Sequence, residues 1–225
     1  MDLLTLKQIC LKHGTDKGMH KINSKGEVYA DIYEKYFSSM RNKKINILEL
    51  GVKSGCSIRA FREYFPNANI YAIDIDPNCI VHNDPDNKIF VGIMSQTDKV
   101  SINSFLKDLK FDIILDDASH VNKFTIESYN ILNDRLNSQG LYIIEDLGNS
   151  YFKLETDFSV SKIWPGMKYN TTSPSDFNND IIDIHNFTNN LIEKLDYSNN
   201  YATYLELSDI SFIHRYKFII VICKN

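Results

Sequence analysis

From residue 45 onward, apolar and polar positions follow two patterns in turn. Short apolar runs are separated by longer segments in which apolar side chains recur every three or four positions. The runs predict buried strands and the longer segments predict amphipathic helices. The expected strands cover residues 45–50, 70–74, 89–93, 112–116 and 140–145, and the expected helices cover about 55–65, 98–109 and 122–136. Strands that alternate with helices predict an α/β fold with a parallel, doubly wound sheet.

The first 42 residues show only the helical pattern. A first helix would carry an apolar face made of Leu3, Leu4, Leu6, Ile9, Cys10 and His13. We expect it to end at Gly14, because glycine is a frequent C-terminal helix signal. A second helix would carry Val28, Ile32, Tyr33, Tyr36 and Phe37 on one face. The two helices are joined by a polar loop over residues 14–20, with Gly14 and Gly18 in it.

The C-terminal third is less regular. Residues 147–175 are rich in Gly, Pro, Ser, Thr and Asn and predict an irregular loop, whose aromatic residues would either stack on a ligand or be buried. A helix is expected at about 176–195, followed by two β-rich runs at 203–213 and 217–223 that predict a hairpin. Gly140 is expected to end the helix that precedes the fifth strand. The chain is thus interpreted as one domain, with a helical extension (1–42), a core (43–146) and a C-terminal part (147–225).

Charge and composition exclude some partners. The net charge of −4 provides no basic field for nucleic acid or an anionic membrane. No apolar run reaches the roughly 18–20 residues that span a bilayer, and the N-terminus lacks the pattern of a signal peptide. The four cysteines are scattered without a CxxC pair, which favours free thiols in a reducing cytoplasm. We therefore expect a cytoplasmic protein with no nucleic-acid partner and no membrane span, and the sequence leaves a homo-oligomer open.

Ionisable residues follow two of the predicted strands. Asp116-Asp117-Ala118-Ser119-His120 comes directly after the apolar run 111–115, and Glu145-Asp146 comes after the run 141–144. Ligands bind at this edge of open α/β sheets, and buried ionisable groups cost stability unless they are paired. If the two strands are neighbours, their carboxylates and the imidazole converge at one point. This arrangement predicts a metal-assisted active site.

A glycine loop follows the first predicted strand. Glu49-Leu50-Gly51-Val52-Lys53-Ser54-Gly55 runs from the strand into a helix, and its glycines would let the backbone approach a ligand. It fits neither the G-x-G-x-x-G dinucleotide loop nor the P-loop, which needs Lys and Ser or Thr after its last glycine. Asp74 ends the next strand, where a carboxylate can accept hydrogen bonds from both ribose hydroxyls of a nucleoside.

The spacing Glu49-x-Gly51-x-x-x-Gly55 resembles motif I of the class I S-adenosylmethionine-dependent methyltransferases. The ordered set of further motifs resembles a metal-dependent subgroup that methylates sugars of macrolides and other glycoconjugates. These motifs are Gly14–Gly18, Gln96–Asp98, Asp116–His120 and Ile144–Asp146, and the similarity covers roughly residues 10–150. The resemblance implies a Rossmann-like, seven-stranded, mostly parallel sheet with helices on both faces and a C-terminal antiparallel hairpin. Ala118 stands where the family commonly has Gly, so we expect a slightly altered turn there.

The resemblance also implies cofactors and residue roles. The cofactors would be S-adenosyl-L-methionine and a divalent cation, for which the oxygen ligands favour Mg²⁺ and the lack of Cys or a second His disfavours zinc. The implied metal ligands are Asp117, Glu145 and Asp146, with His120 as the general base and Asp117 also counted as catalytic. The implied cofactor-binding residues are Lys17, Glu49, Gly51, Gly55, Asp74, Gln96 and Asp116. For Lys17 a solvated side chain stays open, as does an ordinary turn residue for Gln96.

The expected activity is therefore methylation of a sugar hydroxyl. The preferred acceptor is a nucleotide-activated sugar or a glycan precursor of a bacterial surface polysaccharide. Two alternatives stay open at this point: a small-molecule O-methyltransferase that acts on a phenol or a glycosylated natural product, and a non-catalytic scaffold that retains the cofactor fold.

Overall fold

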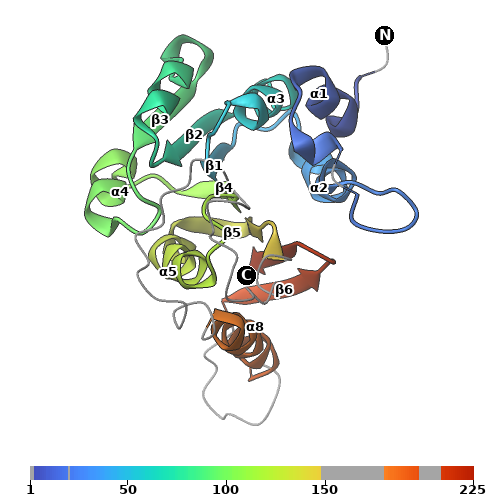
Figure 1. Cartoon of the computed structure of the whole chain (residues 1–225), viewed down its shortest axis with the longest axis vertical. Helices are drawn as coiled ribbons and strands as arrows, with labels where there is room; N and C mark the ends of the chain where they lie inside the picture. The colour runs from blue at the N-terminus through green and yellow to red at the C-terminus, as the bar shows by residue number, and fades with distance from the viewer. Residues whose placement is uncertain (1–2, 20, 148–179, 198–208) are drawn as a thin grey trace, which may run out of the picture.

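The computed structural model describes residues 3–19, 21–147, 180–197 and 209–225 (Figure 1). Most of the loop expected over 147–175 and the first part of the hairpin expected over 203–223 lie outside the described residues. The predicted α/β alternation of the core is confirmed, as is the helix expected near 176–195.

A single seven-stranded sheet runs through the molecule in the order β3-β2-β1-β4-β5-β7-β6. Its strands are β1 (Asn46–Leu50), β2 (Asn69–Asp74), β3 (Ile89–Ile93), β4 (Phe111–Asp116), β5 (Leu136–Ile144), β6 (Ile210–Arg215) and β7 (Ile220–Lys224). Strands β1 to β5 are parallel, and β7 joins β5 antiparallel, with β6 as its hairpin partner. The strand order reverses between β1 and β4, so their carboxyl ends form the switch point at which such sheets bind ligands.

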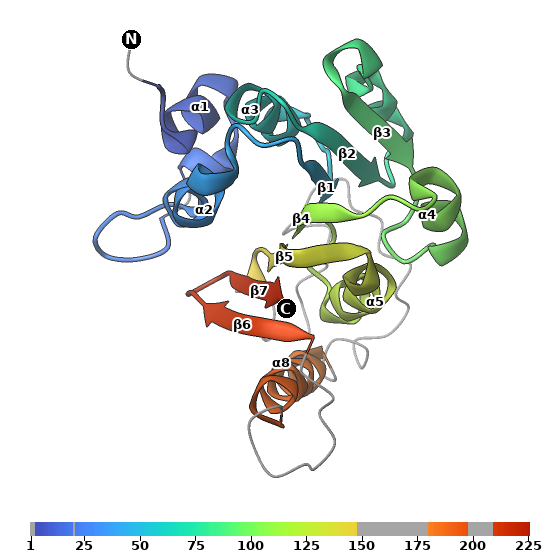
Figure 2. The ribbon, with the colours of Figure 1, turned by 180° about the vertical axis from the view of Figure 1, so that it is seen from behind.

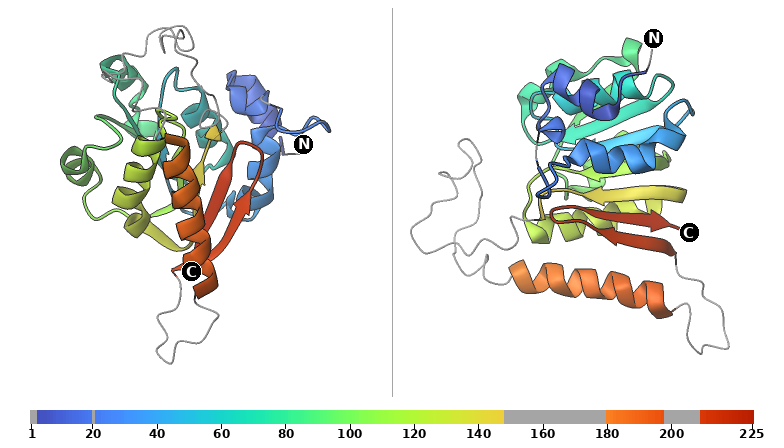
Figure 3. Two further views of the ribbon diagram at one scale, coloured as in Figure 1. Left: turned by 60° about the horizontal axis from the view of Figure 1, so that its bottom comes forward. Right: turned by 90° about the vertical axis from the view of Figure 1, so that its right-hand side faces the viewer.

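Helices cover both faces of the sheet (Figures 1, 2 and 3). One face packs against α1 (Leu6–His13), α2 (Tyr29–Phe37) and α3 (Cys56–Tyr64). The other packs against α4 (Lys99–Leu106), α5 (Asn122–Leu132) and α8 (Asp180–Tyr197). Short 3₁₀ turns are η1 (Asp16–Gly18), η2 (Ser38–Met40), η3 (Pro77–His82), η4 (Pro85–Asn87) and η5 (Asn133–Arg135).

Alternation along the strands divides the core into two clusters. In β4, Ile113 and Leu115 point toward the α1–α3 side, whereas Ile114 points toward the α4–α5 side. Successive side chains of a strand face opposite ways, so residues that continue the strand are divided in the same manner. The same alternation determines toward which face of the sheet each acid at a strand end points.

Two boundaries differ from the sequence prediction. The first helix begins at Leu6 because Thr5 caps it, and Leu3 and Leu4 are exposed before it rather than part of its apolar face. Gly140 does not end a helix: α5 ends at Leu132, and Gly140 lies inside β5 beside an irregularity in its pairing with β4. A Cβ at Gly140 would come within 2.8 Å of the Asn137 carbonyl oxygen, which explains the glycine in a strand.

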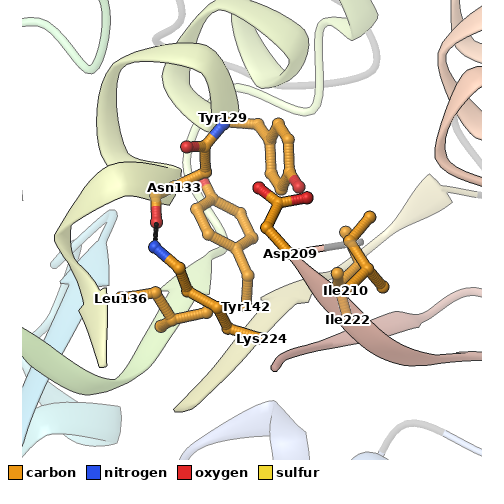
Figure 4. A pocket seen from close by; sticks show the side chains of 8 residues that line it. All are labelled: Tyr129, Asn133, Leu136, Tyr142, Asp209, Ile210, Ile222 and Lys224. Atoms are coloured by element: carbon orange, nitrogen blue, oxygen red, sulfur yellow. Dashed lines mark hydrogen bonds between the residues drawn. The ribbon is translucent and has the colours of Figure 1, made fainter. Parts of the chain in front are cut away.

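A small pocket lies at the amino ends of the parallel strands (Figure 4). Its walls come from Tyr129, Asn133, Leu136, Tyr142, Asp209, Ile210, Ile222 and Lys224. The Lys224 ammonium donates a hydrogen bond to the Asn133 carbonyl across it, at 3.3 Å. The predicted site residues lie at the opposite edge of the sheet, so this pocket is not the candidate site.

None of the helices in the described parts of the chain combines the length and apolar character that crossing a membrane requires.

Candidate active site

The acids after β4 and β5 are held side by side by main-chain hydrogen bonds. The Asp117 N–H donates to the Leu50 carbonyl at 3.0 Å, and the Glu145 N–H donates to the Asp116 carbonyl at 3.0 Å. Because side chains alternate, Asp116 points toward α5 and Asp117 toward the N-terminal helices. The two strands are neighbours, so the expected convergence of the acids that follow them is confirmed.

The glycine loop packs against this acidic edge. Gly51 has φ = 94°, and a Cβ there would overlap the Asp117 carbonyl group, 2.9 Å from its carbon. Asp74 holds the loop from the other side, since one of its carboxylate oxygens accepts hydrogen bonds from the Val52 and Lys53 N–H groups at 2.7 and 2.9 Å. Burial raises the pKa of Asp74, but these bonds and one from the Asp76 N–H outweigh it and hold the pKa below its usual value.

Gly51→Ala is expected to destabilise the fold by about 1–3 kcal/mol beyond the cost of its positive φ, because the added methyl group meets main chain that cannot move aside. It should also abolish binding of a ligand that the loop holds. Gly26→Ala is the matched control: Gly26 also has positive φ (80°) but has open space around its Cβ position. The control should cost about 1 kcal/mol from backbone strain alone. Urea unfolding of both variants measures the difference, and equal costs would contradict the close packing of the loop.

Lys17 lies at the centre of the acidic edge. Helix α1 stops at Gly14, which is left-handed, and Thr15 caps the η1 turn that follows. Gly18 packs tightly on α1, since a Cβ there would come within 3.0 Å of the Cys10 Cβ. This short turn brings Lys17, with only 2 % of its side chain exposed, to the sheet edge. The solvated Lys17 left open by the sequence is therefore excluded.

Three carboxylates surround the Lys17 ammonium. It donates hydrogen bonds to Asp117 and, at 2.9 Å, to Glu145, and it lies 3.7 Å from the nearer Glu49 oxygen. Burial lowers the pKa of Lys17, but the three carboxylates outweigh burial and place it well above its usual value. The surrounding carboxylates thus favour the charged form of Lys17.

Two phenols of α2 also reach the acids. The Tyr29 hydroxyl donates to Asp146 at 2.5 Å, and the Tyr33 hydroxyl donates to Glu145. Burial and the neighbouring carboxylates raise the pKa of both phenols well above the usual value, so both remain donors. Sequence reasoning placed Tyr33 in the helix core and did not single out Tyr29. The i, i+4 spacing of two tyrosines on one helix was the available signal.

Asp117, His120 and Asp146 form a group that could hold a metal ion. One ligand atom from each lies within 4.8 Å of the others. The His120 Nε2 atom is 3.7 Å from one Asp117 oxygen and 3.6 Å from one Asp146 oxygen. All three side chains are partly exposed, at 11–24 %, so a ligand can reach them, whereas Glu145 is almost fully buried at 3 %.

The backbone at this group is strained. His120 and Asp146 have φ values of 56° and 54°, a region that L-residues rarely adopt and that often marks functional sites. Ala118 is not among the residues with positive φ, and the left-handed residue of this segment is His120, so alanine fits at 118 without backbone strain. A turn slightly altered from that of the family stays a prediction.

Glu49 and Asp116 each carry a buried oxygen without a hydrogen-bond partner in the described residues. The other Glu49 oxygen accepts a hydrogen bond from Ser57 at 2.8 Å. Burial raises the pKa of both Glu49 and Asp116 to about 7. A cationic ligand at this edge would favour the charged form of both and satisfy the open acceptors.

The Gln96 side-chain amide forms hydrogen bonds that connect the turn after β4 to helix α5. It donates to Ser128 at 2.8 Å and to Asp116 at 3.4 Å, and it accepts a hydrogen bond from the Ser119 N–H at 3.1 Å. Contact with the cofactor stays a prediction for Gln96. The structure does bring the predicted residues of the glycine loop and of both acidic motifs together with Lys17.

No family model matches the chain. In sequence it is similar to the 8-demethyl-8-α-L-rhamnosyl tetracenomycin-C 2′-O-methyltransferase of Streptomyces olivaceus, with 30 % identity over 160 residues. It is also similar to the mycinamicin VI 2″-O-methyltransferase of Micromonospora griseorubida, with 30 % identity over 128 residues. These matches cover 67 % and 53 % of this chain but only 40 % and 31 % of the two relatives. The chain therefore matches less than half the length of either enzyme.

Solved structures are similar over nearly the whole chain. One is the MycE methyltransferase of the mycinamycin biosynthetic pathway in complex with Mg and SAH, with a TM-score of 0.74, 21 % identity, and coverage of 100 % of this chain and 54 % of that one. Another is the same protein with Mg, SAH and mycinamycin VI, with a TM-score of 0.71 and 22 % identity, covering 99 % of this chain and 55 % of that one. At this level of identity the likeness shows the fold, which is the expected Rossmann-like methyltransferase fold.

Proposed function

Because this chain is a class I S-adenosylmethionine-dependent methyltransferase related to the sugar O-methyltransferases of macrolides and other glycosides, we propose that it methylates a sugar hydroxyl with the help of a divalent cation. The observation that carries the proposal is the convergence of Asp117, His120 and Asp146 beside the glycine loop. It combines possible cation ligands and a base at the ligand-binding edge of the sheet.

The charges at the edge fit a cation. Five carboxyl groups lie there (Glu49, Asp116, Asp117, Glu145 and Asp146), and the Lys17 ammonium lies within 4 Å of three of them. The excess of negative charge and the oxygen donors suit Mg²⁺. Asp117 and Asp146 would hold it. Glu145 is the third ligand that the sequence predicts, and it would join them by exchanging its bond to Lys17.

The buried carboxylate oxygens that lack hydrogen-bond donors suit the cationic groups of the methyl donor. S-adenosylmethionine carries an ammonium and a sulfonium, and the buried oxygens of Glu49 and Asp116 lack donors. Gly51 and Gly55 belong to the loop that leads into the N-terminus of α3, where helix N–H groups can bind a ligand, and Asp74 lies at the end of β2, where a ribose would lie. Gln96 and Lys17 complete the proposed cofactor surroundings.

The reaction needs a proton acceptor near the sugar oxygen. The cation, when bound, makes the sugar hydroxyl easier to deprotonate. His120 would accept the hydroxyl proton on Nε2, flanked by the carboxylates of Asp117 and Asp146. The sugar oxygen then forms a bond to the methyl carbon as the carbon–sulfur bond of the donor breaks, and S-adenosylhomocysteine leaves.

For the acceptor, we propose a sugar already attached to a small natural product. The acceptor expected from the sequence was a nucleotide sugar or a surface-polysaccharide precursor. The relatives' names instead specify methylation of a rhamnosyl tetracenomycin and of mycinamicin VI, and they supply no support for a polysaccharide. We keep the cytoplasm as the proposed location, in which the four unpaired cysteines would stay reduced.

Calorimetric titration with S-adenosylhomocysteine tests the donor half of this proposal. We expect saturable binding, and its absence at millimolar ligand would contradict a methyltransferase. Mass spectrometry after incubation with glycosylated natural products and, separately, with nucleotide sugars tests the acceptor half. We expect one added methyl group on the first set, and turnover confined to nucleotide sugars would overturn this choice of acceptor.

A further inference from the structure

We propose that the N-terminal segment sets the geometry of the cation site, with Tyr29 and Lys17 as positioning residues. Each binds one oxygen of a carboxylate and leaves the other oxygen facing His120. The inference rests on the proposed function, because it concerns the cation that this function requires. It assigns a task to the helical extension over residues 1–42.

The contacts divide the two oxygens of Asp146 between different neighbours. The Tyr29 hydroxyl donates to Oδ1 at 2.5 Å, whereas Oδ2 lies 3.6 Å from the His120 Nε2 atom. Asp146 lies two residues after the end of β5, and the Tyr29 hydroxyl of α2 is a hydrogen-bond donor to its Oδ1 atom. The phenol therefore determines which oxygen faces the shared space.

The two carboxylate oxygens of Asp117 are also divided between different neighbours. Lys17 donates to its Oδ2 atom, and Oδ1 lies 3.7 Å from the His120 Nε2 atom. The two oxygens that remain are Asp117 Oδ1 and Asp146 Oδ2, and both face the same imidazole nitrogen. A carboxylate with one oxygen anchored loses less rotational freedom when the other oxygen binds a cation.

Glu145 differs, because both of its oxygens have donors. Tyr33 donates to Oε1 and Lys17 to Oε2, and the side chain is almost fully buried. We infer that Glu145 holds Lys17 in place in the cation-free protein. Tyr29 and Tyr33, one helical turn apart, thus act on different acids, which makes them separable by mutation.

The test measures binding of Mn²⁺ alone, by electron paramagnetic resonance, without cofactor or acceptor. Tyr29→Phe should weaken Mn²⁺ binding about 10–100-fold, the usual cost of losing a partner of a metal ligand. Tyr36→Phe is the matched control: it removes a hydroxyl from the same helix, but one that contacts His214 and Tyr216 on β6 and its turn. The control should bind Mn²⁺ as the unmodified protein does, and S-adenosylhomocysteine affinity should be unchanged in both variants.

Each of the following results would overturn a named part of the proposal. Unchanged Mn²⁺ affinity in Tyr29→Phe would overturn the positioning role while leaving the proposed function intact. Weakened binding of both Mn²⁺ and S-adenosylhomocysteine would mean a general disturbance and would also overturn it. A loss of Mn²⁺ affinity in Tyr33→Phe but not in Tyr29→Phe would transfer the role to Glu145 and its partner. If the unmodified protein binds no Mn²⁺, the cation in the proposed function itself fails.

Discussion

Replacing His120 by alanine is expected to lower the rate of methyl transfer by about 10²–10⁴-fold, the range for loss of a general base. The expectation follows from the position of its Nε2 atom, which lies 3.6–3.7 Å from one oxygen each of Asp146 and Asp117. The measurement is turnover at saturating donor, acceptor and Mg²⁺. S-adenosylhomocysteine affinity should stay the same, because the proposed cofactor contacts come from other residues.

His214→Ala is the matched control for this variant. His214 is exposed on β6, where its ring stacks on Phe212 and bonds to the Tyr36 hydroxyl. Its loss should leave the rate of methyl transfer unchanged. If His120→Ala retained the rate of the control, the proton would have another acceptor and the role given to His120 would be wrong.

Lys17→Met should lower the free energy of unfolding by about 3–5 kcal/mol in the absence of divalent cations. Removing one partner of a buried ionic group leaves the others uncompensated, and here Asp117, Glu145 and Glu49 lose the cation they share. Methionine is an unbranched apolar side chain only one heavy atom shorter than lysine, so little packing is lost. Urea unfolding measures the change.

Lys7→Met is the control for a lysine in a partly exposed pair. Lys7 lies 3.1 Å from Asp31, with 37 % and 30 % of the two side chains exposed, so the loss should cost at most about 1 kcal/mol. A Lys17→Met cost no larger than that of Lys7→Met would contradict the account of the buried charges.

The core fold could be predicted because its signals are local. Five apolar runs of strand length, separated by helical periodicity, are sufficient to predict β1 to β5 and the parallel sheet. The acids at the strand ends then had to meet, because parallel strands bring their carboxyl ends to one edge. The errors at Leu3, Leu4 and Gly140 are boundary errors, where a single cap or bulge decides the outcome.

The partners of the acids could not be predicted in the same way. Tyr29 and Asp146 are 117 positions apart, and Lys17 and Asp117 are 100 apart. The apolar pattern of α2 shows that Tyr33 is buried but does not show that its hydroxyl reaches a carboxylate. Such contacts depend on how the N-terminal segment crosses the sheet, which periodicity does not encode. The same limit applies to Lys17, for which the sequence left open both cofactor binding and a solvated side chain.

The identity of the sugar acceptor does not follow from the residues of the candidate active site. In the proposed function the acids and His120 act on a hydroxyl, and these residues do not specify the sugar that carries it. The relatives' names direct attention to glycosylated natural products, although this chain covers less than half of their length. An acceptor panel is therefore part of any test of the activity.

Cation-dependent methyl transfer is the central claim, and one measurement tests it most directly. The protein is incubated with S-adenosylmethionine and the best acceptor of the panel, in a chelator and again after Mg²⁺ is restored in excess, and the product is followed by mass spectrometry. The account predicts no methylated sugar with the chelator and full recovery of methylation with Mg²⁺. Methylation that continues undiminished in the chelator would contradict it.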